Sequence, residues 1–542
     1  MGKPGRGVLS VSVRAALALG VIVGQYLLAL AVLAVLAVVD VFLIRSGQLF
    51  TFNVLEGLVG SVAIAWVVVR SVFLVRRAER ANQPAALPLT SAEQPGLWRR
   101  VREIAEQVGT RPPTELLLTA DATALVQHGG RLWGLVPGER RLYIGAPLLI
   151  GLSAGELDAV LAHEMGHYAN SDVRLEALVW AARDRLLRTV LALSGNSAKG
   201  TKDGKDGKEG KGGKGAADGP DHYLAKVFIP YARFSLRATQ AVSRRQEFAA
   251  DLVAAHVAGR DNAIAALRQL PTLEGAHDVY LAHYALMGRT EGFLPPAGQV
   301  HGGLLHFLAD GLRQEEMSEL VRNPPAEPSS PYDSHPPVLE RIAAMEALPD
   351  DMRQADVARG GALALLREPH GVLVELEAAW PGTAKPEPRR VAWQELALCV
   401  RRAKHTRLAG PLRAAVGQAA AARGWAVGAR SELDVLLDMI DRGLWFEAAD
   451  LLPKSEVAAR SGGRARREFA RTAFRSALYH LSVSALAEAG HVTWEVCWAG
   501  PAVREVAPDG FGQALKVALD AATADPPDTA PLRGLLTGVR LR

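Results

Sequence analysis

Two histidines four residues apart, His163 and His167, enclose a glutamate in the segment His-Glu-x-x-His. On an α-helix, side chains four positions apart lie on the same face, so both imidazoles can point at one metal ion. Glu164 directly follows the first histidine, where its carboxylate can reach a water on the metal rather than the metal itself. The spacing therefore predicts part of a metal site. The alternative is a surface helix that carries two histidines by chance.

Two acidic residues further along the chain, Glu247 and Asp251, repeat the four-residue spacing in a segment with a helical pattern. A catalytic zinc ion commonly takes three protein ligands and leaves one position for water. Glu247 would complete a set of two histidines and one carboxylate, and Asp251 could accept the N–H of a ligating histidine. The alternative is a solvated helix face on which Arg244 and Arg245 pair with the two carboxylates.

The residues around His163 predict the helix that the site requires. Ser153 and Glu156 form a capping box, in which each satisfies a backbone N–H near the other. Asn170 is a plausible C-terminal stop. Four apolar residues form a stripe that would dock this helix on a core: Leu157, Val160, Leu161 and Met165.

A small sheet is expected before this helix. Residues 115–119 have the composition of a strand, and residues 131–136 and 140–144 flank a Pro-Gly-Glu turn and predict a hairpin. An edge strand of such a sheet could pair with an extended peptide.

Two apolar runs near the start of the chain predict a membrane anchor over residues 1–78. Residues 15–39 carry no charge, and residues 52–75 carry charges only near their ends, so each run is long enough to span a bilayer. A signal peptide is the alternative for the first run, but its apolar region would be shorter. Basic residues flank the pair on both outer sides, whereas the turn holds only Arg45. The positive-inside rule therefore predicts a multi-pass protein of the cell membrane with its bulk in the cytoplasm.

The rest of the chain divides by composition. Residues 79–350 are expected to form one domain, interrupted by a disordered Gly/Lys loop over 196–221, and residues 351–542 a separate helical domain. A long helix from 223 to 257 is expected to break at Pro230. The net charge of +5 is small for 542 residues, and basic residues are not interleaved with aromatics, so nucleic-acid binding is not expected. Cys399 and Cys497, the two cysteines, provide no disulfide framework.

Three motifs resemble those of the HtpX-like membrane zinc metallopeptidases, a family related to the CAAX prenyl proteases. They are His-Glu-Met-Gly-His-Tyr-Ala-Asn-Ser-Asp at 163–172, Ser-Arg-Arg-Gln-Glu-Phe-Ala-Ala-Asp at 243–251 and Ser-His-Pro-Pro-Val-Leu-Glu-Arg-Ile at 334–342. They stand in the family's order after two predicted spans. The resemblance covers about residues 10–350 and excludes the C-terminal domain. HtpX-type proteins often carry two further spans between the zinc motifs, where this chain has a charged helix over 175–193 and the Gly/Lys loop.

The resemblance implies one Zn²⁺ per chain, bound by His163, His167 and Glu247, with Glu164 as general base. Asp251 and Asn170 are expected beside the ligands without binding the metal. Roles near the bound substrate or the developing oxyanion are implied for His335 and Arg341. The alternative for these two is a rigid turn at His335 and a structural ion pair at Arg341.

The expected protein is mostly α with a small β-sheet (α+β): a zincin-like peptidase domain behind two transmembrane helices, followed by the helical C-terminal domain. The resemblance implies a bacterial endopeptidase that hydrolyses peptide or protein substrates, including membrane proteins, in quality control or processing at the lipid bilayer. Two alternatives stay open. One is an inactive zinc-binding scaffold tethered to the membrane, and the other is an anchored peptidase for soluble substrates.

Overall fold

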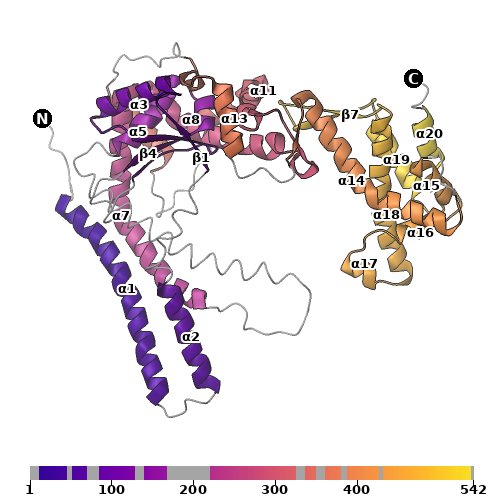
Figure 1. Cartoon of the computed structure of the whole chain (residues 1–542), viewed down its shortest axis with the longest axis horizontal. Coiled ribbons are helices and arrows are strands. Elements are labelled where there is room, and N and C mark those ends of the chain that lie inside the picture. Colours follow the sequence, from indigo (N-terminus) through magenta and orange to yellow (C-terminus); the bar gives the residue numbers. More distant parts are fainter. Residues whose placement is uncertain are drawn as a thin grey trace. The chain divides into compact units, whose positions relative to one another are not determined.

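The computed structural model describes residues 11–45, 52–69, 85–128, 139–167, 220–324, 336–349, 360–379, 387–425 and 431–538. Helices dominate these ranges and the sheets are small, which agrees with the expected α+β class (Figure 1). By its internal contacts the chain divides into two units: Met1–Gly275 with Met317–Pro381, and Ala276–Glu316 with Gly382–Arg542. The domain boundary at residue 350 stays a prediction.

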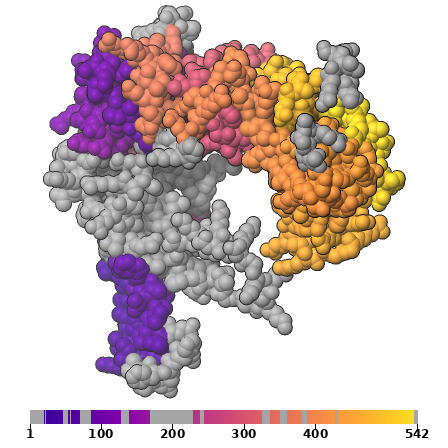
Figure 2. Space-filling model, turned by 45° about the vertical axis from the view of Figure 1, so that its right-hand side comes forward, coloured from indigo at the N-terminus to yellow at the C-terminus, as the bar shows by residue number. Residues whose placement is uncertain are grey.

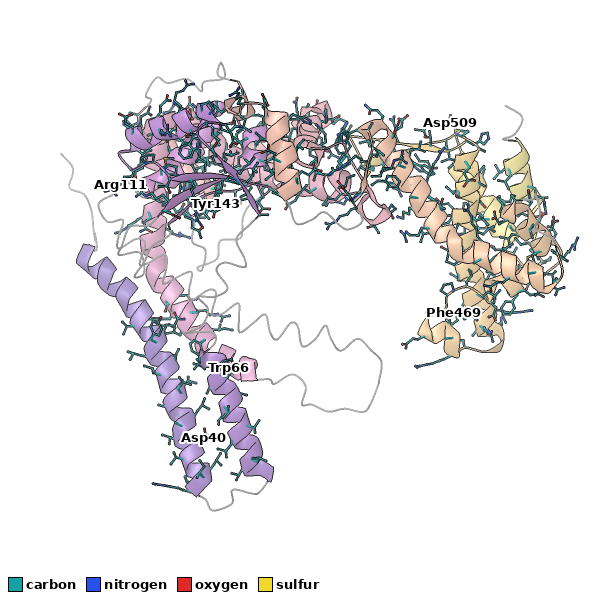
Figure 3. All side chains as sticks on the ribbon, in the orientation of Figure 1. Asp40, Trp66, Arg111, Tyr143, Phe469 and Asp509 are labelled. Carbon is teal, nitrogen blue, oxygen red and sulfur yellow. The ribbon has the colours of Figure 1, made fainter. Side chains whose placement is uncertain are left out.

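The first unit begins with two apolar helices, α1 (Val11–Arg45) and α2 (Phe52–Val68), which pack against each other. Within the described ranges, one stretch, Val23–Arg45, is long and apolar enough to cross a membrane, and α2 offers the shorter apolar stretch Gly57–Trp66. Residues 70–75 of the second expected span lie outside these ranges. Many apolar side chains of the pair face outward, on the surface coloured indigo in Figure 2; Phe42 is 74% exposed and Trp66 is 60% exposed. Asp40 lies toward the C-terminal end of α1, and Trp66 lies toward the C-terminal end of α2 (Figure 3).

A four-stranded sheet follows, in the order β1-β2-β4-β3. Its strands are β1 (Ala86–Leu89), β2 (Glu115–Thr119), β3 (Ala124–His128) and β4 (Arg140–Gly145). β4 pairs in parallel with β2 and antiparallel with β3. The expected hairpin partner at 131–136 lies outside the described residues, and the two edges of β4 pair with β2 and β3.

Helices on the sheet hold the position of α5 (Ala154–Gly166), the helix with His163. α3 (Pro95–Val108) buries Leu97, Val101 and Ile104, and its Trp98 Nε1 donates to the carbonyl of Leu89 in β1 at 2.8 Å. The Nε of Arg100 on α3 donates to Asp158 of α5 at 2.7 Å, and its Nη2 donates to the second oxygen of the same carboxylate. α4 (Ala146–Gly151) runs from β4 toward α5.

One long helix, α7 (Pro220–Ala258), connects the apolar pair to α5, because it packs against α1, α2 and α5 (Figure 1). Its start at Pro220 lies within the expected loop over 196–221. The expected break at Pro230 is wrong, since the helix continues through it. Phe228, 1% exposed, packs with Ala29 and Val68 of the apolar pair. Packing of Phe228 against both apolar helices favours continuation of the helix through Pro230, two residues further on.

The remaining elements of the first unit are α8 (Arg260–Tyr280), which continues into the second unit, α12 (Val338–Glu346), η6 (Ala362–Leu365) and α13 (Pro369–Ala379). The expected charged helix over 175–193 lies outside the described ranges.

The second unit is a helical body whose core forms around α14 (Trp393–Ala422) and α18 (Gly463–Glu488). Two consecutive helices of this unit, α15 (Glu432–Asp441) and α16 (Trp445–Ala449), are separated at Gly443, whose φ is +74°. Its shorter elements are η3 (Leu281–Ala285), η4 (Arg289–Glu291), β5 (Phe293–Leu294), α9 (Gln299–Gly302), α10 (Leu304–Ala309), α11 (Gly311–Arg322, shared with the first unit), β6 (Arg389–Arg390), α17 (Glu456–Arg460), β7 (Thr493–Val496), β8 (Val503–Val506), α19 (Phe511–Ala522) and α20 (Ala530–Gly538).

Candidate metal centre

The helix that carries His163 begins as the sequence predicts. The Oγ of Ser153 accepts the Glu156 backbone N–H at 3.2 Å, and Glu156 Oε2 accepts the Ser153 backbone N–H at 2.7 Å. This confirms the capping box. The predicted apolar stripe is buried along α5, at Leu157, Val160, Leu161 and Met165. The cap sets where α5 begins, and the stripe sets which side of the helix is buried. Together they determine the face on which His163 and His167 lie.

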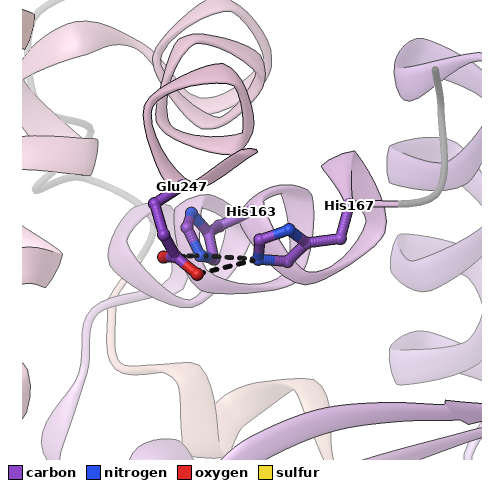
Figure 4. A group of neighbouring side chains, drawn as sticks. All are labelled: His163, His167 and Glu247. Atoms are coloured by element: carbon purple, nitrogen blue, oxygen red, sulfur yellow. Dashed lines mark hydrogen bonds and ion pairs between the residues drawn. The ribbon is translucent and has the colours of Figure 1, made fainter. Parts of the chain in front are cut away.

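Three side chains converge where α5 meets α7: His163, His167 and Glu247 (Figure 4). The Nε2 atoms of the two histidines lie 3.2 Å apart. Glu247 Oε2 lies 3.6 Å from His163 Nε2, and Glu247 Oε1 lies 3.8 Å from His167 Nε2. Glu247 is 5% exposed, so its carboxylate is held inside the protein. Three donors therefore face one small volume from two helices.

These separations fit a zinc ion. Zinc takes imidazole nitrogen and carboxylate oxygen at about 2.0–2.2 Å in tetrahedral geometry, which places neighbouring ligand atoms roughly 3.3 Å apart. The observed separations run from 3.2 to 3.8 Å. The donor set of two imidazoles and one carboxylate is one that catalytic zinc sites use.

A close crossing of α5 and α7 brings the third donor to the histidines. A Cβ atom at Gly166 of α5 would lie 3.1 Å from Val253 Cβ and 3.3 Å from Ala250 Cα, both on α7. Glycine therefore lets the two backbones approach. Glu247, Ala250 and Asp251 are buried, so this face of α7 lies inside the fold. The alternative of a solvated face at Glu247 and Asp251 is wrong.

Asp251 lies behind His163. The distance between His163 Nδ1 and Asp251 Oδ1 is 3.0 Å, so the imidazole N–H can donate to the carboxylate. Asp251 also accepts from Arg341 of α12: Nε lies 2.8 Å from Oδ2, and Nη2 lies 2.6 Å from Oδ1. The ion pair recorded for Arg244 is with Glu340, at 3.9 Å. Asp251 is thus joined to His163 and to an arginine from another helix.

Charge in this cluster is strongly coupled. Burial lowers the pKa of His163, but the hydrogen bond to Asp251 and the nearby Glu247 carboxylate outweigh burial and raise this pKa to about 9. Burial raises the pKa of the Asp251 carboxyl, yet hydrogen bonds from Arg341 and His163 leave it below its ordinary value. A proton and a metal ion compete for the same imidazole nitrogen. The neighbours of His163 therefore favour a positive charge at its position.

The other expected site residues divide by location. Glu164 is half-buried on α5, and its charge contributes to the raised pKa values of His163 and Arg341. Asn170 and His335 lie outside the described residues, so their roles stay predictions. Sequence reasoning left the partner of Arg341 unnamed. The sequence feature that could have indicated this contact is the order of the motifs along the chain, because Arg341 stands on α12 and this helix packs on α7.

Across the ranges that the structure describes, His163, His167 and Glu247 form the one group of three or more His, Cys, Asp or Glu side chains close enough to hold a metal ion. The remaining histidines in these ranges join no such group.

Part of the chain is similar in sequence to known proteins. Residues 129–348 match the model of Peptidase family M48. The chain is 34% identical over 205 residues to a protein named Protease HtpX from Aeromonas salmonicida, covering 37% of this chain and 57% of that relative. It is 26% identical over 306 residues to Protease HtpX from Pseudomonas paraeruginosa, covering 56% of this chain and 87% of the relative. The crystal structure of S. mikatae Ste24p aligns with a TM-score of 0.25 and 18% identity, over 62% of this chain and 65% of that one.

The match to the Aeromonas relative thus spans little more than half of that protein's length. The segment that matches the family model contains both helices of the metal centre. Residues 129–348 are thus similar to peptidase family M48, and the chain resembles proteins named Protease HtpX.

Proposed function

We propose that this chain is a membrane-anchored, zinc-dependent endopeptidase. The observation that carries the proposal is the convergence of His163, His167 and Glu247 on one volume, within the segment that matches the family. A zinc ion bound there would supply Lewis-acid chemistry, polarising a peptide carbonyl and making water nucleophilic near pH 7. Each of the three side chains would hold the ion, and Asp251 would orient His163 through its Nδ1–H.

Glu164 is the general base of this proposal. It follows the first ligand on α5 and is half-buried, so water can reach its carboxylate while the protein fixes its position. It would take a proton from the attacking water and pass it to the leaving amine. A role for His335 in holding the oxyanion stays part of the proposal, on the resemblance of its motif alone.

The substrate would enter as an extended peptide along β3. This strand is an edge of the sheet and packs on α5, and within the described residues no strand pairs with its other side. An edge strand offers backbone donors and acceptors to a peptide, with little demand on side chains. Peptides with N-methylated backbone amides near the scissile bond should be cleaved more slowly than unmodified ones. Equal cleavage would remove β3 from the proposal.

The apolar helices α1 and α2 would anchor the enzyme, with the metal centre on the cytoplasmic side. Support comes from the apolar stretch Val23–Arg45 and from the basic residues that flank the pair. Quality control or processing of membrane proteins is the proposed role. Comparing cleavage of a misfolded membrane protein with cleavage of a soluble unfolded one separates this role from that of an anchored peptidase for soluble substrates.

The test is metal analysis together with casein hydrolysis, with and without a chelator, on the full chain in detergent micelles. Glu164→Gln should keep its zinc and lose activity by a factor of about 100 or more, because the base is gone while the ligands remain. Glu106→Gln, at an exposed glutamate of α3, is the matched control and should behave as wild type. Full activity in Glu164→Gln would end the mechanism. Zinc without proteolysis of any candidate substrate would favour the tethered scaffold.

A further inference from the structure

Arg341 is a buried guanidinium that lies against Asp251 and against two of the proposed zinc ligands, His163 and Glu247. It is 8% exposed and lies on α12, which packs against α7. Its Nε and Nη2 each donate to one oxygen of Asp251, at 2.8 and 2.6 Å. Two parallel N–H donors on one carboxylate fix its plane as well as its charge.

The same carboxylate faces the ligand His163. Asp251 Oδ1 lies 3.0 Å from His163 Nδ1 and also accepts from Arg341 Nη2. A histidine that donates from Nδ1 presents the lone pair of Nε2, the atom that faces His167 and Glu247. Arg341 Nη2 lies 3.8 Å from Glu247 Oε2 as well. Arg341 therefore stands behind two of the three proposed ligands.

We propose that Arg341 is a positioning residue of the metal centre, which holds Asp251 so that Asp251 sets the ring orientation and the metal-facing nitrogen of His163. Arg341 then acts on the zinc ligands, not on the oxyanion. The inference rests on the proposed zinc site and goes beyond it in this respect.

Two effects of opposite sign make the inference testable. Removing the guanidinium takes a positive charge away from a bound cation, which by itself would tighten zinc binding. Removing it also frees Asp251 to turn away from His163, which weakens zinc binding. Loss of partners that orient metal ligands typically costs 10- to 100-fold in affinity. The positioning role therefore predicts weaker binding, and a purely electrostatic role predicts tighter binding.

The experiment measures the zinc dissociation constant by chelator competition on the full chain in micelles. Arg341→Gln should weaken zinc binding by about tenfold or more, and excess zinc should restore much of its activity. Arg341→Lys keeps the charge but cannot donate to both carboxylate oxygens from a planar fork. Its zinc affinity should therefore lie between those of wild type and Arg341→Gln. If Arg341→Gln fails to fold, Arg341→Lys decides, and wild-type affinity in that variant overturns the inference.

Arg100→Gln is the matched control. Arg100 also donates to both oxygens of a buried aspartate, Asp158, which lies on the same helix as His163. Arg100 joins Asp158 to α3, whereas Arg341 joins Asp251 to the ligand His163, so Arg100→Gln should lower stability and leave zinc affinity unchanged. A weakening in Arg100→Gln equal to that in Arg341→Gln would overturn the inference, since loss of any arginine that supports α5 would then suffice.

Each outcome separates this inference from the proposed function. Unchanged zinc affinity in Arg341→Gln, with an activity loss that excess zinc does not restore, would place Arg341 at the reacting substrate and overturn the positioning role. Tighter zinc binding in Arg341→Gln would mean that Arg341 acts only through its positive charge, and it would overturn the positioning role. Failure of the wild-type chain to bind zinc would instead end the proposed function. Loss of zinc binding in Glu247→Gln would support that function.

Discussion

Asp251 and Arg341 are both buried, with exposed fractions of 2% and 8%. The idealised cost of bringing each charge out of water is large, so each depends on the other for compensation. The carboxylate compensates the guanidinium and also receives the His163 N–H. The protein thus uses one ion pair both to join α7 to α12 and to orient a proposed ligand.

This dependence predicts non-additive effects on stability. Asp251→Asn and Arg341→Gln should each destabilise the metal-free chain by about 3 kcal/mol, because each leaves the other charge buried without its partner. The double variant should be more stable than the sum of the two effects implies, by about 2 kcal/mol. Urea unfolding of the four proteins, followed by circular dichroism, measures this coupling. Additive effects would mean that the pair is not coupled in the folded state.

At the scale of elements, the centre depends on how closely α5 and α7 approach. Gly166 stands at their crossing, and a Cβ there would meet the α7 backbone and the β-branched Val253 at 3.1–3.3 Å. Neither neighbour can swing aside as the end of a long side chain would. A larger residue must therefore move α7, and with it Glu247.

Gly166→Ala should lower the free energy of unfolding by about 1–3 kcal/mol, the usual cost of overpacking, and should weaken zinc binding. Gly275→Ala in α8 is the control, because a Cβ at that position meets nothing within 4 Å. That variant should be neutral or stabilised by up to about 1 kcal/mol. Thermal unfolding and chelator competition on both variants check the prediction. Equal stability changes in the two would show that the helix crossing tolerates the methyl group.

α7 also links the apolar helices α1 and α2 to the candidate metal centre. Near its start, Phe228 packs between the two apolar helices, and the Tyr231 hydroxyl lies where a Cβ at Gly24 of α1 would come within 2.5 Å. Near its end it carries Glu247 and Asp251. A single rigid helix therefore transmits the position of the apolar pair to two residues of the proposed site.

For the molecule as a whole, the second unit buries histidines in their neutral form. Burial lowers the pKa of His301 to about 4, helped by neighbouring His277. Burial likewise lowers the pKa of His405 to about 4, with contributions from His480 and two nearby cations, Arg401 and Lys404. The His405 ring stacks on Trp494 with centroids 5.5 Å apart. Both side chains lie inside the core and avoid charge near neutral pH.

Acid should therefore destabilise this unit. The ordinary histidine pKa of 6.5 exceeds the folded value of about 4, so between these values the unfolded chain binds more protons. Stability is fully present above pH 6.5 and falls as the pH is lowered toward 4. At pH 5 each histidine should cost on the order of 1–2 kcal/mol. Urea unfolding at pH 7 and pH 5 measures the loss.

His405→Phe is the test variant, because it keeps an aromatic ring beside Trp494 and cannot take up a proton. It should lose less stability than wild type between pH 7 and pH 5. An identical loss in the two proteins would show that His405 does not contribute to the acid sensitivity of the unit.

The sequence by itself determined what depends on near neighbours in the chain. It specified the capping box at Ser153, the shared face of His163 and His167, and the strand over 115–119. These features follow from helical and strand periodicity and from hydrogen bonds three or four residues apart, so local residues suffice to encode them. The expectation that Glu247 is the third ligand agrees with its position, but it drew on the motif's resemblance to a family.

Only the tertiary structure decided which distant groups meet. It gave Asp251 the partner Arg341, paired β3 with β4, and carried α7 through Pro230. Such choices depend on packing between elements that no local pattern describes. A proline disfavours a helix by a fixed local cost, whereas burial of Phe228 against α1 and α2 depends on the whole arrangement. Local chemistry thus supplied the donors, and packing brought them together.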